Sequence, residues 1–237
     1  MDHFESILRK TLSDFQIELD DQAISRLCLY NDLLIEWNEK INLTALTAPE
    51  DVALKHFADS LMLLRYVDIK NGARVIDVGT GAGFPGLVLK IARPDIELVL
   101  LDSLQKRLTF LEEVCNALGF EDVLMVHSRA EDGARDAFRN HFDIAVSRAV
   151  APLNILCEYD IPYVREGGRF IAMKGKDSDE ELKAAENAIG VLGGKFLQKH
   201  DFILGEAGER SIIEIEKIAP TPEQYPRRSK AIQNKPF

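Results

Sequence analysis

Apolar and polar positions recur along this chain with two different periods. In the first 70 residues the apolar side chains follow helical spacing, first at Phe4, Ile7, Leu8, Leu12 and Phe15, then at Ile24, Leu27, Leu34 and Trp37. From residue 73 onward, short strand-like runs fall near 73–78, 96–101, 123–127, 142–147, 168–173, 195–204 and 210–217. Helical patterns separate most of these runs, and strands that alternate with helices predict a mostly parallel sheet with right-handed crossovers.

The helices between the strands have recognisable starts and stops. The patterns predict helices over 85–92, 104–118, 152–164 and 178–193, and a third N-terminal helix after residue 47. Thr47–Glu50 and Ser178–Glu181 fit the capping-box pattern, which would open two of these helices. The last two strand-like runs follow one another with only Gly205 and Gly208 as turn signals, so a β-hairpin is expected to end the sheet.

One glycine-rich segment carries the strongest functional signal. Asp77-Val-Gly-Thr-Gly-Ala-Gly-Phe-Pro-Gly86 lies between a predicted strand and a predicted helix, where free amides and close backbone approach suit a small polar ligand. Its second half matches the dinucleotide pattern G-x-G-x-x-G, and its first half matches acidic-x-G-x-G-x-G, the pattern of S-adenosylmethionine (SAM) enzymes. Asp77 favours SAM, because a carboxylate suits a cationic ammonium and sulfonium better than a pyrophosphate. Asp102, at the end of the next strand, could accept hydrogen bonds from ribose hydroxyls with either cofactor.

These patterns predict an α/β fold: the seven-stranded, Rossmann-like sheet of SAM-dependent methyltransferases with an N-terminal helical extension. A terminal hairpin on a parallel sheet is typical of that fold, whereas a dinucleotide-binding domain usually continues with alternating strands and helices. The expected boundaries are residues 1–70 for the helical extension, 71–219 for the SAM-binding core and 220–237 for a basic C-terminal tail.

The loops that follow the strands supply the candidate site, because ligands in open parallel sheets bind at the carboxyl ends of the strands. Arg148 and Lys174 are the predicted catalytic residues, placed to hold an acceptor base or its phosphates. The predicted cofactor contacts are Asp77, Gly79, Thr80, Gly81, Gly83, Phe84, Asp102, Ser103, Ala130, Glu131 and Arg148. We expect Ala130 and Glu131 to meet the adenine edge and Arg148 to lie nearest the transferred group.

The overall charge argues against a dedicated nucleic-acid binder, since 39 acidic residues outnumber 29 basic ones. Basic side chains are nevertheless concentrated in the tail and after the strands. The predicted RNA contacts are Asn42, His56, Arg129, Lys174, Arg227, Arg228 and Lys230. No run of ~18 apolar residues suggests a membrane span. Three widely spaced cysteines without C-x-x-C favour reduced thiols and a cytoplasmic protein, and the five histidines share no metal-ligand spacing.

Motifs that are missing from the sequence disfavour some kinds of acceptor atom. No cysteine stands in the Pro-Cys context that methylation of cytosine carbon 5 requires, and no Asp/Asn-Pro-Pro-aromatic motif indicates an exocyclic amine. A ring nitrogen with a free lone pair, such as guanine N7, needs no catalytic base. Protein and small-molecule acceptors stay open on these grounds.

The segment Val75–Gly86 with its Phe-Pro-Gly ending resembles the cofactor loop of glucose-inhibited division protein B, the RsmG family of 16S rRNA guanine-N7 methyltransferases. Further motifs are similar to that family in the same order: Trp37-Asn38, Asn42–Thr44, His56–Leu61, Ser128–Glu131, Ser147–Ala149, Lys174-Gly175 and Tyr225–Arg228. The resemblance implies methylation of the guanosine at conventional position 527, in the 530 loop of 16S rRNA. It also implies SAM contacts at Gly79, Phe84, Ala130, Glu131 and Arg148, and 16S rRNA or the 30S subunit as partner.

The end of the chain departs from the family pattern, because Lys230 and Ile232 stand where the family usually has Gly and Pro. Two alternative functions use the same glycine turn: an NAD(P)-dependent oxidoreductase, and a non-catalytic SAM-binding factor associated with ribosomes. The sequence favours a monomer without determining the oligomeric state.

Overall fold

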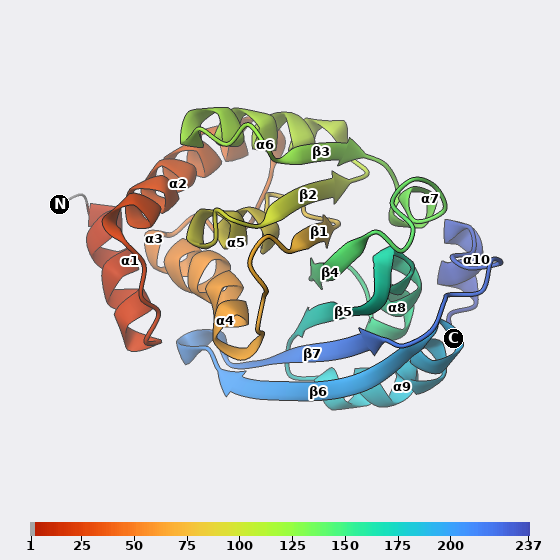
Figure 1. Cartoon of the computed structure of the whole chain (residues 1–237). Helices are drawn as coiled ribbons and strands as arrows, with labels where there is room; N and C mark the ends of the chain where they lie inside the picture. Colours follow the sequence, from red (N-terminus) through yellow and green to blue (C-terminus); the bar gives the residue numbers. More distant parts are fainter. Residues whose placement is uncertain (1–2) are drawn as a thin grey trace.

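The computed structural model describes residues 3–237 and contains one seven-stranded sheet in the order β3-β2-β1-β4-β5-β7-β6 (Figure 1). The strands are β1 (Arg74–Val78), β2 (Glu97–Asp102), β3 (Leu124–His127), β4 (Phe142–Arg148), β5 (Val164–Lys174), β6 (Gly194–Ile203) and β7 (Glu209–Lys217). The first five strands pair in parallel, whereas β7 runs antiparallel between β5 and β6. The predicted fold class is therefore confirmed, terminal hairpin included. The strand order reverses between β1 and β4, so their carboxyl ends form the switch point at which such sheets bind ligands.

Helices cover both faces of this sheet (Figure 1). The first group in the chain is α1 (His3–Asp14), α2 (Asp21–Ile41), α3 (Pro49–Asp51), the π-helical turn η1 (Val52–Ala58), α4 (Asp59–Tyr66), α5 (Gly86–Ala92) and α6 (Gln105–Leu118). The second group is α7 (Ala130–Gly133), α8 (Leu153–Asp160), η2 (Ile161–Tyr163), α9 (Ser178–Val191), η3 (Gly205–Ala207) and α10 (Ser229–Asn234). No helix among residues 3–237 is long and apolar enough to cross a membrane.

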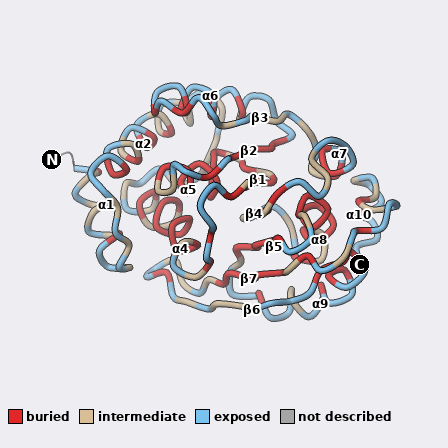
Figure 2. The backbone as a smooth tube through the Cα atoms, in the orientation of Figure 1, coloured by how far each residue is buried: buried red, intermediate tan, exposed pale blue. Residues whose placement is uncertain are grey.

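The two faces of the sheet have separate cores. Along β1, Val75 faces a core shared with α1, α2, α5 and α6, whereas Ile76 faces a core shared with α8, α9 and α10. The central strands are buried on both faces, as Figure 2 shows, which explains why they appear in the sequence as nearly continuous apolar runs.

The N-terminal helices pack directly onto the glycine-rich turn. The ring of Phe84 stacks on that of Tyr30 from α2, with centroids 5.5 Å apart. A Cβ atom on Gly83 would collide with the hydroxyl group of Tyr30. The sequence-based boundaries at residues 70 and 219 stay a prediction, but the first segment shares its core with the sheet and forms one side of the candidate site.

Three local predictions are wrong. Neither capping box forms: Ala48 and Asp177 precede the helices and give no side-chain cap, and the hydroxyl of Ser178 pairs with that of Ser211 at 2.8 Å. The helix expected over 152–164 ends at Asp160, because Val164 already pairs with Phe142 in the sheet. The short helices α7 and α10 were not predicted.

Candidate active site

The glycine-rich turn between β1 and α5 is held together by the carboxylate of Asp77. Its Oδ2 accepts hydrogen bonds from the Thr80 hydroxyl at 2.7 Å and from the Gly86 amide at 2.8 Å. Gly79, Gly81 and Gly83 all have positive φ, so three alternate residues with positive φ turn the chain back onto the sheet. Asp77 itself is fully buried, and its role visible in the structure is to fix the shape of this turn.

Asp102 performs a similar task from the end of β2. Its Oδ2 accepts from the Gly81 amide at 2.9 Å and from the Arg107 guanidinium at 3.2 Å, while Oδ1 accepts from the Leu104 amide at 2.9 Å. The amides of Gly79 and Thr80 donate to the Leu101 carbonyl just before it. The ends of β1 and β2 are therefore joined through backbone amides and one carboxylate.

A pocket of about 370 Å³ opens above these strand ends. Its lining includes six of the predicted residues: Gly79, Asp102, Ser103, Arg129, Ala130 and Glu131. Backbone geometry sets its inner wall, since a Cβ atom on Gly79 would lie 2.8 Å from a methyl carbon of Val150. The structure thus brings together loops that follow β1, β2, β3 and β4.

The other predicted cofactor residues lie outside that lining. Asp77, Thr80, Gly81 and Gly83 build the turn behind the pocket wall, and Phe84 is buried against Tyr30 and His56. Their direct contact with a cofactor stays a prediction. A further hollow of about 430 Å³ lies at the opposite end of the sheet, near Gly72 and Gly168, where open parallel sheets do not bind ligands.

The charges at this pocket suit SAM. Asp102 and Glu131 are 2% and 3% exposed, and the Glu131 carboxylate has no hydrogen-bond or ion-pair partner among residues 3–237. Asp77 lies beneath the turn with Oδ1 unpaired, and burial raises its pKa to about 6. A ligand with ribose hydroxyls and a cationic ammonium and sulfonium can satisfy such carboxylates, whereas a pyrophosphate on the glycine turn would lie over the Asp77 carboxylate.

Arg148, at the end of β4, reaches across to the N-terminal helices. Its guanidinium donates to Asp59 Oδ2 at 2.6 Å and to the Lys55 carbonyl at 3.0 Å, and lies 5.3 Å from the centre of the Phe84 ring. Arg210 from β7 approaches the other oxygen of Asp59 at 3.5 Å. Asp59 therefore lies between two arginines from different strands.

His56 packs against the same aromatic ring. Its imidazole stacks on Phe84 at 4.4 Å and 8°, and its Nε2 is 2.9 Å from the Thr44 hydroxyl. Burial and the nearby Arg148 charge lower the pKa of His56 to about 3. The imidazole is therefore neutral at physiological pH and offers hydrogen bonding or stacking rather than a cationic charge.

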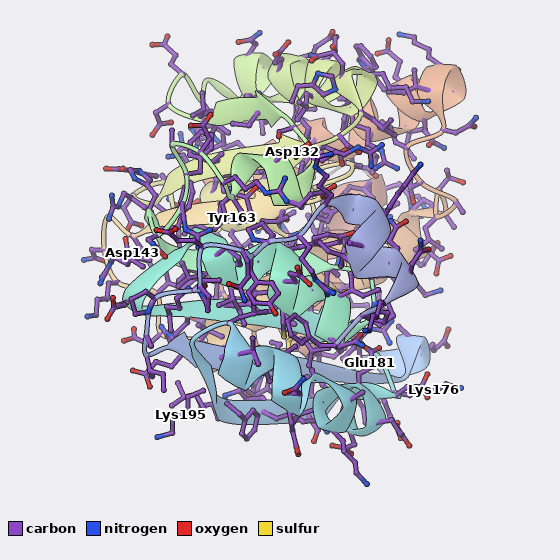
Figure 3. All side chains as sticks on the ribbon, turned by 90° about the vertical axis from the view of Figure 1, so that its right-hand side faces the viewer. Asp132, Asp143, Tyr163, Lys176, Glu181 and Lys195 are labelled. Atoms are coloured by element: carbon purple, nitrogen blue, oxygen red, sulfur yellow. The ribbon has the colours of Figure 1, made fainter. Side chains whose placement is uncertain are left out.

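A second pocket of about 600 Å³ lies on the other side of the loop after β4. The charged side chains that line it include Lys55, Asp59, Arg148, Lys174 and Arg210. Lys174 donates to the Ala151 carbonyl at 2.8 Å and pairs with Glu181 at 2.5 Å; Figure 3 labels Glu181 near the start of α9. Residues 149–151 line both pockets, so one thin segment separates them.

The predicted RNA contacts fall into three environments. Arg129, Arg228 and Lys230 are exposed near the rim of the first pocket, and Lys174 and His56 line the second. Asn42 ends α2 in a left-handed conformation. Arg227 instead forms a salt bridge with the fully buried Glu158. Its RNA contact stays a prediction, and the structure gives it a packing role.

Sequence reasoning did not select Asp59 or Arg210, although both belong to the second pocket. Asp59 lies within the family-like segment His56–Leu61, which was a usable signal. Arg210 lies in an ordinary amphipathic strand, and only the pairing of β7 with β5 brings it near Arg148.

The fold, and the pocket with buried carboxylates at its switch point, define a SAM-dependent methyltransferase. Solved structures with this fold include a 16S rRNA (adenine(1408)-N(1))-methyltransferase variant with cosubstrate SAM from Catenulisporales acidiphilia, with TM-score 0.52 and 14% identity over 64% of this chain and 88% of that chain. TrmN from Thermus thermophilus gives TM-score 0.53 and 19% identity over 70% of this chain and 53% of that chain. These identities establish the fold alone.

The sequence comparisons identify the family. Residues 23–212 match the GidB family model, described as rRNA small subunit methyltransferase G. Ribosomal RNA small subunit methyltransferase G from Alkaliphilus metalliredigens is 47% identical over 98% of both chains, and that of Clostridium perfringens strain 13 is 46% identical over 100% of both. The chain belongs to the rRNA small subunit methyltransferase G family, and its cofactor is SAM.

Proposed function

We propose that this chain transfers a methyl group from SAM to N7 of the guanosine at conventional position 527, in the 530 loop of 16S rRNA. The observation that carries the proposal is the pair of pockets on either side of residues 149–151. One pocket has the buried carboxylates of Asp102 and Glu131 at its walls and suits the cofactor, and the other has four basic side chains and two carboxylates at its walls. A guanine base with its flanking phosphates needs cations of this kind.

The chemistry asks little of the protein beyond positioning. When bound, SAM would supply a methyl group on a sulfonium, and guanine N7 would accept it through its lone pair while the C–S electrons stay with the sulfur. The chain would therefore have no proton to remove. The chain aligns the two ligands, excludes water and stabilises the base. We expect Arg148 and Lys174, which pair with Asp59 and Glu181 in the structure, to donate to guanine O6 or a phosphate when RNA binds.

The alternative functions are less well supported. An NAD(P)-dependent oxidoreductase would place its pyrophosphate on the glycine turn, over the buried carboxylate of Asp77. A non-catalytic SAM-binding factor would need the first pocket only, and would leave the charged second pocket without a role. We expect the enzyme to act as a cytoplasmic monomer on 16S rRNA or the 30S subunit.

The test is label transfer from methyl-tritiated SAM. The purified chain should label 30S subunits or 16S rRNA lacking the modification, and mass spectrometry of nuclease fragments should locate 7-methylguanosine in the 530 loop. Arg148→Ala should bind SAM yet transfer little label. SAM binding without transfer to any 16S rRNA substrate would support the non-catalytic factor, and binding of NAD(P) in place of SAM would support the oxidoreductase.

A further inference from the structure

The C-terminal tail folds back onto the sheet rather than extending into solvent. The guanidinium of Arg135, just after α7, donates to the Pro226 carbonyl at 2.7 and 3.0 Å. Arg139 donates to the carbonyls of Tyr225 and Thr221, each at 2.8 Å. Figure 1 shows the tail returning to the side of the molecule that carries α7 and α8. Two arginines that follow α7 thus hold the start of the tail by hydrogen bonds to its backbone carbonyls.

A buried ion pair fixes the next residue of the tail. Arg227 donates through Nε and Nη2 to the Glu158 carboxylate, at 2.9 and 2.6 Å, and its own amide donates to the same carboxylate at 2.7 Å. Glu158 is fully buried in α8, and the ring of Phe237 lies 5.0 Å from the guanidinium. The pair raises the pKa of Arg227, chiefly through the hydrogen bonds to Glu158.

This arrangement brings α10 against the cofactor pocket. Ser229 and Gln233 are four residues apart, so they share one side of the helix, and both line the 370 Å³ pocket. Ile232 points the other way and is fully buried in the core beneath α8. Figure 3 views this side of the molecule and labels Asp132 on α7, beside which α10 lies.

The wall made by α10 lines the same pocket as Ala130 and Glu131, which are predicted to meet the adenine edge. The α7 segment carries Ala130 and Glu131, and residue Arg135 beyond it holds the tail at Pro226. Arg148, where the methyl group should be, lies at the opposite end of the site among the N-terminal helices. Adenine and ribose carry both donors and acceptors, which a carboxamide and a hydroxyl can both satisfy.

We propose that the C-terminal tail is part of the SAM site: Ser229 and Gln233 contact the adenosine portion of the cofactor, and the Arg227–Glu158 ion pair holds them in place. Ser229 and Gln233 are binding residues, while Arg227 is a positioning residue that acts through α10. The inference concerns the cofactor alone and holds whichever RNA is the acceptor. It also separates Arg227 from its neighbour Arg228, which is exposed.

The experiment is calorimetry on the full chain with SAM and with 5′-methylthioadenosine, which retains the adenosine half. Gln233→Ala should weaken both ligands by about two- to tenfold, the range of one lost hydrogen bond. The matched control is Gln224→Ala, since Gln224 is exposed in the same tail and lies outside the pocket. Unchanged affinity for both ligands in a Ser229→Ala/Gln233→Ala double variant would overturn the proposal. A loss for SAM alone would overturn the adenosine assignment.

A second measurement tests the positioning role. Arg227→Ala should weaken SAM while Arg228→Ala leaves SAM affinity unchanged, and Arg227→Lys should recover part of the loss. Arg227→Ala also leaves Glu158 unpaired and could weaken SAM binding by destabilising the fold. Hydrogen exchange of the wild-type chain avoids this problem: the amides of residues 229–234 should exchange more slowly with SAM bound. Equal exchange with and without SAM would contradict a tail that contacts the cofactor.

Discussion

The two pockets beside residues 149–151 differ in how their charges are satisfied. In the cofactor pocket, backbone amides and glycine geometry set the shape, and Glu131 keeps an unpaired carboxylate. In the second pocket, Arg148 is already paired with Asp59, and Lys174 with Glu181. The first pocket is therefore preformed, and its unpaired Glu131 carboxylate is available to a ligand. In the second pocket, Arg148 and Lys174 would have to give up these internal ion pairs to contact a nucleic acid. Substitutions there should therefore change both the stability of the fold and the activity.

The largest expected effect is at Arg148, which lines the second pocket and is predicted to lie nearest the transferred methyl group. Arg148→Ala should lower kcat by about 10²–10³-fold, the cost of losing a donor aimed at the reacting group. It should also destabilise the fold by up to about 3 kcal/mol, because the buried Asp59 would keep only its longer 3.5 Å contact with Arg210. Single-turnover methyl transfer and urea unfolding measure the two effects.

A double variant separates these two roles of Arg148. Asp59→Asn combined with Arg148→Ala should regain most of the stability but none of the activity. Wild-type kcat in Arg148→Ala would remove this residue from the reaction and leave it a purely structural partner of Asp59.

The buried carboxylate beneath the glycine turn gives a pH test of the first pocket. Burial raises the pKa of Asp77 to about 6, so the folded state holds this proton more tightly than the unfolded state does. Its contribution is favourable at low pH and is lost as pH rises from about 4 to about 6, by about 3 kcal/mol. Asp77→Asn should abolish that decline in urea unfolding, because an amide does not titrate.

The control for Asp77 is a carboxylate outside the core. Asp14→Asn, at the exposed end of α1, should leave the pH profile of the wild type intact. Burial also raises the pKa of Asp160, so the comparison uses the difference between wild type and Asp77→Asn at each pH. Parallel profiles for these two proteins would show that Asp77 is ionised throughout this range.

Asp102 tests whether the first pocket is as preformed as its geometry indicates. Asp102→Ala should weaken SAM by about 1.5–3 kcal/mol, the scale of hydrogen bonds to a charged group. Part of that loss is indirect, since the Gly81 and Leu104 amides lose their acceptor. Asp102→Asn, which keeps one oxygen, should lose less by calorimetry. Equal affinity in all three proteins would place Asp102 outside the site.

The sequence signals for the first pocket are local, so the strand ends that form it could be predicted. A glycine turn, the acidic residue before it and the carboxylate ending the next strand lie within 26 residues of one another. Parallel topology then brings the ends of β1 and β2 together with little ambiguity. The structure adds a role for two of these residues: Asp77 and Gly83 shape and pack the turn, and their contact with the cofactor stays a prediction.

The second pocket was harder to predict, because its contacts join distant parts of the chain. Asp59 and Arg148 are 89 residues apart, and no periodicity links them. Arg227 and Arg228 show the same difficulty at close range. They are adjacent and chemically identical, yet one is paired with a buried glutamate and the other is exposed. Only tertiary structure distinguishes a packing arginine from a surface one.

The smallest expected effect concerns the exposed cations, and it distinguishes the two adjacent arginines. Arg228→Ala with Lys230→Ala removes two exposed charges near the cofactor-pocket rim and leaves the Arg227–Glu158 pair intact. If both contact phosphates of a single-stranded segment, the slope of log K against log salt for 16S rRNA should flatten by about 1.4. SAM affinity should not change.

Arg227→Ala should do the reverse: it should weaken SAM binding while keeping the wild-type salt slope. Fluorescence titrations of labelled rRNA at several salt concentrations measure the slopes. An unchanged slope in the Arg228/Lys230 variant would move the RNA surface to the second pocket, where Lys55, Lys174 and Arg210 already line one cavity.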